Sequence, residues 1–187
     1  TNLPRFSFGA LLAMTLVTST AKGFEVGTKL PRPDQLRGGL VQPKKFTLPT
    51  TRLSASTRIV VFFYTASWCA PCKKIGAALR ETYADFRVHA PGLQFITYSV
   101  DHSSGARAGY LREEAFPWPA IGPSVIDEAP WLTTFPGGTP QFQAFSVAAE
   151  HLEAITLPGP ANEVMSTALV FLRQTALSKN TIRSEGR

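Results

Sequence analysis

The sequence predicts an α/β domain in which a central mixed β-sheet is flanked by helices, preceded by an N-terminal extension. Three observations predict this fold class. A strand-helix-strand-helix order begins at residue 58, two more strand-like segments follow as a hairpin, and an amphipathic helix closes the domain. Alternating strands and helices are typical of parallel β-α-β crossovers, whereas a hairpin pairs its strands antiparallel.

The first half of the domain alternates strand and helix patterns. Residues 58–64 form an unbroken β-branched and aromatic run, which is typical of a central strand buried on both faces. Apolar residues at helical spacing predict a helix over roughly 70–88, which ends before Pro91-Gly92. A second strand is predicted over 93–100, and a short helix over 105–115.

The second half begins with a rigid loop, because three prolines within residues 116–123 exclude a regular helix. Residues 141–147 then alternate polar and apolar side chains, and 151–157 follow after three residues, which predicts an antiparallel hairpin. The last amphipathic helix is predicted over 162–177, and a polar tail over 178–187.

The first 21 residues have the pattern of a secretory signal peptide. One basic residue precedes an uncharged run from Phe6 to Ala21, and small residues precede a predicted cleavage point after Ala21. The run is short and rich in Ser and Thr compared with a membrane span of about 20 residues. We expect an exported, periplasmic or extracytoplasmic protein without stable membrane insertion after cleavage. An uncleaved anchor, a transit peptide and a disordered leader are the alternatives.

Residues 22–57 predict an extended, weakly structured arm outside a domain that spans 58–177, because they contain four prolines and four glycines. A short strand is expected near Leu40–Leu48. Residues 1–58 hold nine Lys/Arg and two acidic residues, a net charge of +7, whereas residues 59–187 hold ten and eleven, a net charge of −1. A nearly neutral domain without a basic cluster argues against nucleic-acid binding.

The two cysteines of the chain, Cys69 and Cys72, lie where the first predicted strand meets the first predicted helix. Unpaired backbone N–H groups and the helix dipole favour a thiolate at the first sulfur, and Lys73 and Lys74 add positive potential. Thiolate is the attacking species in disulfide exchange. The spacing therefore predicts Cys69 as the nucleophile and Cys72, one turn into the helix, as the thiol that resolves a mixed disulfide.

A cysteine pair at this spacing can also bind zinc, attach haem or form a purely structural disulfide. A zinc site needs two further ligands, and His89, His102 and His151 are scattered along the chain without a second Cys-x-x-Cys. Haem attachment needs a histidine directly after the second cysteine, where this chain has Lys73. A purely structural disulfide would close a loop too small to stabilise the fold much through chain entropy.

Three segments resemble the thioredoxin superfamily. "FFYTASWCAPCKK" is similar to its active-site strand and helix start, and "GGTPQFQAF" to its cis-proline element. "AFPWPAI" is similar to a loop of the tryparedoxin and nucleoredoxin branch, and TlpA-like thiol-disulfide oxidoreductases are also close in motif. The resemblance covers roughly residues 36–177 and implies a thioredoxin fold. It further implies that Pro140 is a cis-proline beside the sulfurs, that the Thr139 backbone pairs with substrate, and that Trp68 and Trp118 line the site.

The chain also departs from members of that superfamily. Phe63 stands where thioredoxin has a buried aspartate, and Ile75 stands where exported cytochrome-maturation reductases often have a glutamate. No obvious carboxylate is therefore positioned to take the proton of Cys72, and Asp101 and water are the weaker candidates.

Together these observations predict an exported thiol-disulfide oxidoreductase that acts on protein thiols or disulfides, most naturally as a reductase. We expect a monomer with no metal or other cofactor and an electron donor of unknown identity. The direction of exchange depends on reduction potential and partner supply, so oxidase and isomerase use stay open. The alternative is a non-catalytic thioredoxin-like protein-binding module.

Overall fold

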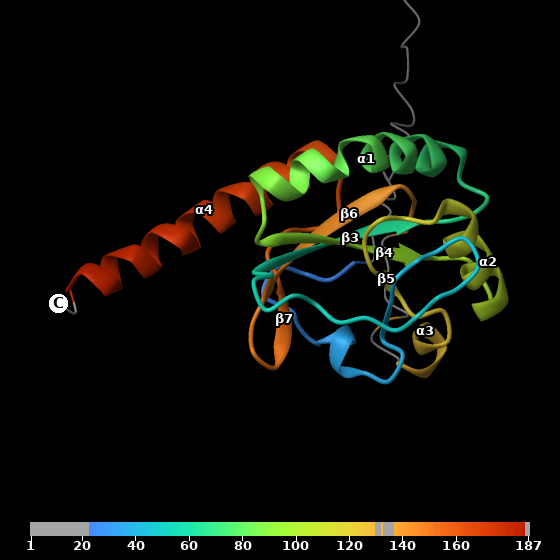
Figure 1. Ribbon diagram of the computed structural model, residues 1–187, viewed down its shortest axis with the longest axis horizontal. Helices are drawn as coiled ribbons and strands as arrows, with labels where there is room; N and C mark the ends of the chain where they lie inside the picture. The colour runs from blue at the N-terminus through green and yellow to red at the C-terminus, as the bar shows by residue number, and fades with distance from the viewer. Residues whose placement is uncertain (1–22, 130–131, 133–136, 186–187) are drawn as a thin grey trace, which may run out of the picture.

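The computed structural model describes residues 23–129, 132 and 137–185. A mixed sheet of seven strands forms its centre in the order β1-β7-β6-β3-β4-β5-β2 (Figure 1). The strands are β1 (Lys29–Pro31), β2 (Leu40–Val41), β3 (Ile59–Thr65), β4 (Leu93–Ser99), β5 (Ala120–Ile121), β6 (Gln141–Val147) and β7 (His151–Ala154). The helices are α1 (Ala70–His89), α2 (Ser104–Glu114), α3 (Val125–Glu128) and α4 (Ala161–Glu185), with a 3₁₀ turn η1 (Pro33–Gln35).

Strand β3 is the centre of the sheet and is buried along its whole length, as its unbroken apolar run predicts. It pairs in parallel with β4 and antiparallel with β6, so the sheet is mixed, as expected. Alternate side chains of β3 enter two separate hydrophobic clusters because successive residues of a strand point to opposite faces. The predicted fold class, a mixed sheet flanked by helices, is confirmed.

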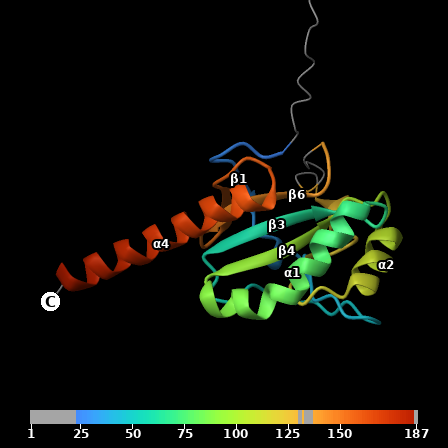
Figure 2. The same cartoon turned by 90° about the horizontal axis from the view of Figure 1, so that it is seen from above.

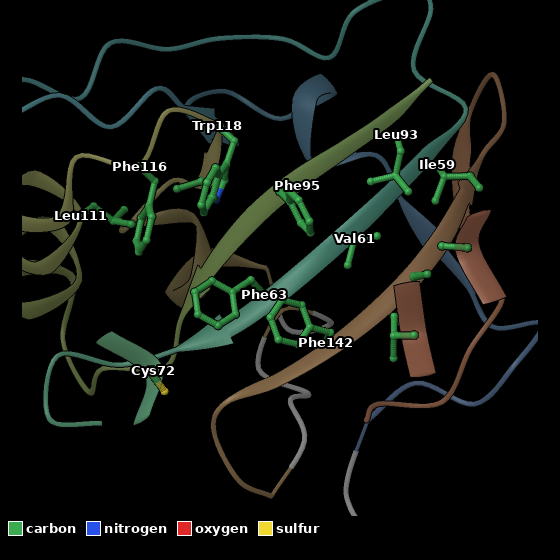
Figure 3. Close-up of a cluster of buried hydrophobic side chains, with 14 of the residues drawn as sticks. Ile59, Val61, Phe63, Cys72, Leu93, Phe95, Leu111, Phe116, Trp118 and Phe142 are labelled. Atoms are coloured by element: carbon green, nitrogen blue, oxygen red, sulfur yellow. The ribbon is translucent and has the colours of Figure 1, made fainter. Parts of the chain in front are cut away.

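The two faces of the sheet are covered differently. Side chains of α1, α2 and α4 join Ile59, Val61 and Phe63 of β3 in one cluster (Figure 3). On the other face, Val60 and Phe62 of β3 lie in a cluster with α3 and with apolar side chains from residues 24–40. Helices α1 and α4 both lie over the first face (Figures 1 and 2).

Residues 23–57 of the predicted arm are not weakly structured, and the predicted domain boundary at residue 58 is corrected. Strand β1 pairs antiparallel with β7 at one edge of the sheet, and β2 pairs antiparallel with β5 at the other. Phe24, Leu30 and Leu40 are buried in the core. The strand expected near Leu40–Leu48 is shorter, Leu40–Val41. Both edges of the sheet are therefore built from residues that precede β3.

Buried polar contacts fasten the same segment to the domain. The fully buried side chain of Gln143, on β6, donates to the Phe24 and Thr156 carbonyls and accepts from the Phe24 N–H. Arg32 binds Asp34 with two hydrogen bonds and reaches the carbonyl of Ala148, in the β6–β7 turn. Burial acts to raise the pKa of Asp34, but the hydrogen bonds and charge of Arg32 outweigh it and lower that pKa.

Helix α4 is longer than predicted. The amphipathic pattern ends near residue 177, yet the helix continues to Glu185 and extends away from the sheet (Figures 1 and 2). The helix end predicted at residue 177 is thus corrected to Glu185, so residues 178–185 of the predicted polar tail are helical, and residues 186–187 lie outside the described part. Val164 and Ala168 bury the first half of α4 against the sheet.

No helix among the described residues is long and apolar enough to cross a membrane. The predicted signal peptide, 1–21, also lies outside them.

Candidate active site

The cysteine pair lies where β3 leads into α1. Cys69 is the N-cap residue of α1, and its Sγ accepts a hydrogen bond from the Cys72 N–H at 3.2 Å. Pro71 lies in the first turn, where the missing N–H leaves no intrahelical bond unmade. The two sulfurs form a disulfide. The structure therefore brings both cysteines to the helix N-terminus, the position at which a thiolate at Cys69 would be stabilised.

The two sulfurs differ in accessibility. Cys72 is fully buried in the cluster beneath α1, whereas Cys69 keeps 5% of its surface exposed. Trp68, directly before it, is 62% exposed and is among the most exposed large apolar side chains of the described chain. A substrate can thus approach Cys69 past Trp68 but cannot approach Cys72.

After reduction of the disulfide, we expect iodoacetamide to alkylate Cys69 preferentially, with a pH midpoint below about 8.5, the ordinary pKa of a free thiol. The reason is that only Cys69 caps the helix N-terminus and reaches solvent. Peptide mass spectrometry across a pH series measures both quantities. Preferential labelling of Cys72, or a Cys69 midpoint at or above the ordinary value, would contradict the assignment.

The Thr139–Pro140 peptide bond is cis, as the resemblance predicts. The register of β6 against β3 pairs Gln141 with Tyr64, so Pro140 lies level with Thr65, at the end of β3 that leads to Cys69. Thr139 and Pro140 are both partly exposed. The structure therefore gathers Trp68, Cys69, Thr139 and Pro140 at one end of the sheet.

Trp118 does not line this site, and its expected role is corrected. Its side chain has no exposed surface, and its Nε1 donates to Thr97 Oγ1 at 2.8 Å. The ring stacks on Phe116 with centroids 5.1 Å apart and lies away from Cys72 (Figure 3). Nothing in the sequence "PWP" distinguishes a tryptophan that faces a groove from one that donates a hydrogen bond inside the core.

Asp101 does not stand free as a proton acceptor. Its carboxylate accepts from the Ser67 N–H at 3.1 Å, from the Ser67 hydroxyl at 2.7 Å and from the Ser99 hydroxyl at 2.7 Å. No sequence motif indicates that Ser67 and Ser99 meet this carboxylate, because they lie at the ends of different strands. Their parallel pairing brings the carboxyl ends of β3 and β4 together.

Lys73, directly after Cys72, is part of an exposed ion pair. Lys73 lies 3.7 Å from Glu113, and both side chains are exposed enough for solvent to screen the pair. Thr65 and Tyr110 form a buried hydrogen bond of 2.7 Å, and burial raises the pKa of Tyr110, so its hydroxyl stays protonated at neutral pH. Among the described residues, no three His, Cys, Asp or Glu side chains gather as metal ligands.

A Cys-x-x-Cys at the start of the helix after the central strand faces a cis X-Pro at the start of the antiparallel neighbour strand. Parallel β3-α1-β4 and the antiparallel β6-β7 pair complete the arrangement. The chain has the fold of the thioredoxin superfamily. The thioredoxin fold expected from the sequence motifs is thereby confirmed.

Comparison with known proteins gives partial matches. No protein-family model matches the chain. Nucleoredoxin of Danio rerio is 29% identical over 110 residues, which are 58% of this chain and 25% of that protein. The chain therefore spans about a quarter of the length of that relative.

Solved structures with a thioredoxin fold also resemble the chain. The thioredoxin domain of a thiol-disulfide oxidoreductase from Bacteroides vulgatus is 16% identical with a TM-score of 0.45, and the match covers 79% of this chain and 96% of that one. Tryparedoxin from Trypanosoma brucei is 19% identical with a TM-score of 0.44, and the match covers 64% and 82%.

Proposed function

We propose that this protein is a thiol-disulfide oxidoreductase that exchanges disulfides with protein substrates through Cys69 and Cys72, acting as a reductase. One observation carries the proposal: the disulfide lies at the N-terminus of α1, where Cys69 keeps a small exposed surface and Cys72 has none. The similarity to a nucleoredoxin over 110 residues supports it. The partners are protein disulfides and an electron donor of unknown identity.

The reduced form would act in two steps. The Cys69 thiolate attacks one sulfur of a substrate disulfide, which forms a mixed disulfide and releases the other substrate sulfur as a thiolate. Cys72 then loses its proton to solvent and attacks the Cys69 sulfur, which releases the second substrate thiolate and forms the Cys69–Cys72 disulfide. Two electrons pass to the substrate, whose thiolates take up two protons, and an external dithiol restores the protein.

The substrate would lie across Trp68 and the Thr139–Pro140 segment. Trp68 is exposed, and Thr139 and Pro140 are partly exposed. All three lie at the end of the sheet that carries Cys69. An extended substrate strand could pair with the Thr139 backbone and present its sulfur to Cys69, a form of strand addition. No other cofactor is needed for this exchange, because the cysteines supply the electrons.

Replacing Trp68 by alanine should raise the KM for a protein disulfide about fivefold, equivalent to about 1 kcal/mol of binding. The expected cause is loss of an exposed aromatic contact beside Cys69. Steady-state kinetics measure the change. Val88→Ala is the matched control, because Val88 is a 76% exposed apolar side chain near the other end of α1. An equal effect in both variants would contradict a substrate role for Trp68.

Insulin reduction with dithiothreitol tests the proposal directly. We expect the protein to accelerate precipitation of the insulin B chain, and a Cys69→Ser/Cys72→Ser double variant to match the rate of dithiothreitol alone. A wild-type protein that also matches that rate would favour the alternative function, a thioredoxin-like binding module whose thiols are idle.

We further propose that the exchange takes place outside the cytoplasm. The support is the sequence of residues 6–21, an uncharged run that ends in Ser19-Thr20-Ala21. Cell fractionation with mass spectrometry of the mature N-terminus tests this, and we expect an N-terminus at Lys22. A cytoplasmic protein that retains residues 1–21 would contradict it.

A further inference from the structure

The segment that presents the nucleophile is held from a neighbouring strand. Ala66, Ser67 and Trp68 connect β3 to Cys69, and the Ser67 N–H donates to both oxygens of Asp101, at 3.1 and 3.3 Å. The Ser67 hydroxyl adds a third contact at 2.7 Å. Asp101 thus fixes both the backbone and the side chain of the residue two positions before Cys69.

Asp101 is itself held rigidly. It is 4% exposed, and its carboxylate accepts from the Ser99 hydroxyl. Its backbone carbonyl accepts from Arg107 Nη1 at 3.0 Å. Arg107, from α2, is 3% exposed and also donates to the Pro123 carbonyl and to Asp127. The anchor of the Ser67 segment therefore rests on β4 and α2, and does not move with α1.

We propose that Asp101 is a positioning residue, which holds the Ser67-Trp68 segment so that the Cys69 sulfur stays at the N-terminus of α1 and Trp68 stays at the surface. This inference rests on the proposed disulfide exchange. Asp101 acts through Ser67 and takes no part in proton transfer.

The hydrogen bonds favour positioning over proton transfer. An ionised carboxylate accepts hydrogen bonds and donates none, and both oxygens of Asp101 already face donors from Ser67 and Ser99. Accepting a proton from Cys72 would turn one oxygen of Asp101 into a donor, so at least one serine hydroxyl would have to change from donor to acceptor. That rearrangement would alter the contacts that hold Ser67, which only Trp68 separates from Cys69.

Replacing Asp101 by asparagine distinguishes a role in positioning the Ser67-Trp68 segment from an effect of the negative charge of Asp101 on Cys69. The side chain keeps its size but offers one acceptor oxygen in place of two, so the Ser67 contacts cannot all remain. We expect the kcat/KM for insulin to fall about tenfold, and the pH midpoint of Cys69 alkylation to rise. Removing a negative charge without moving the segment would have the opposite effect, because a thiolate at Cys69 would become more favourable. A midpoint that falls or stays unchanged would therefore overturn the proposal.

Three further variants make the test specific. Ser67→Ala removes a single hydroxyl donor to the same carboxylate, so it should raise the alkylation midpoint less than Asp101→Asn, and the double variant should resemble Asp101→Asn alone. Additive effects would mean that Asp101 does not act through Ser67. Asp85→Asn is the control, because it removes an exposed carboxylate near the other end of α1, and it should leave the midpoint unchanged.

Thiol alkylation and insulin reduction test the positioning role of Asp101 and the proposed disulfide exchange separately. Alkylation of the reduced protein needs no substrate, so the midpoints test Asp101 even if the wild-type protein fails to reduce insulin. Circular dichroism shows whether Asp101→Asn folds. If it does not fold, the alkylation midpoint of Ser67→Ala tests the proposal. An active wild-type protein with unchanged midpoints in Asp101→Asn and Ser67→Ala would leave the function standing and refute the positioning role.

Discussion

Replacing Cys69 by serine is expected to abolish disulfide exchange, so that insulin reduction falls to the rate of dithiothreitol alone. Serine lacks a nucleophile of comparable strength at neutral pH, and no other cysteine exists to replace it at the surface. Cys72→Ser is expected to stop turnover too, but only after Cys69 has formed a mixed disulfide that nothing resolves.

The two variants also serve as controls for each other. Both remove the same disulfide, so they share any loss of stability from the missing cross-link. Thermal unfolding of the two proteins measures that shared effect. Retained exchange in Cys69→Ser would mean that the buried Cys72 attacks substrates, which its lack of exposed surface excludes in this structure.

Deleting residues 1–35 is expected to lower the free energy of unfolding by about 3–6 kcal/mol, from the lost burial of Phe24 and Leu30 alone. The deletion also removes β1 and Phe24, whose backbone is one hydrogen-bond partner of the buried Gln143 side chain. Domains of this size have a total stability of about 5–15 kcal/mol. Urea unfolding should therefore show a protein that is marginally folded at best, and its activity should fall with it.

Point variants test the burial of this segment within the full-length chain. Phe24→Ala should cost about 3–5 kcal/mol, as large-to-small changes at buried aromatic positions do. Val26→Ala is the matched control, because Val26 lies two residues away and is 61% exposed. Equal stability of the two variants would mean that the segment is dispensable for the fold.

The middle of the chain could be predicted because its signals are local. Strand β3 is an unbroken apolar run, α1 has helical spacing with a proline in its first turn, and both lie within a residue or two of the expected bounds. The Cys-x-x-Cys at the start of α1 indicated the candidate nucleophile, since the helix N-terminus that favours a thiolate there is a local feature of the sequence.

The structure of residues 22–57 could not be predicted, because it depends on partners distant in sequence. Strands β1 and β2 have three and two residues, too few to show an alternation, and they form by pairing with β7 and β5. The prolines and glycines of this segment predict loop structure even where short stretches of it pair with the edge of a sheet. Nor could the contact of Ser67 with Asp101 be predicted, because it requires the register of β3 against β4.

Intact-mass and peptide mass spectrometry of the Cys72→Ser variant, reduced and then incubated with oxidised insulin, tests the proposed exchange most directly. Attack by the Cys69 thiolate predicts one covalent adduct that dithiothreitol releases, with the mixed disulfide located on Cys69. Cys69→Ser treated in the same way should form none. Absence of an adduct on Cys69 in a folded Cys72→Ser protein, together with unaccelerated insulin reduction by the wild type, would contradict thiol-disulfide exchange as the function of this site.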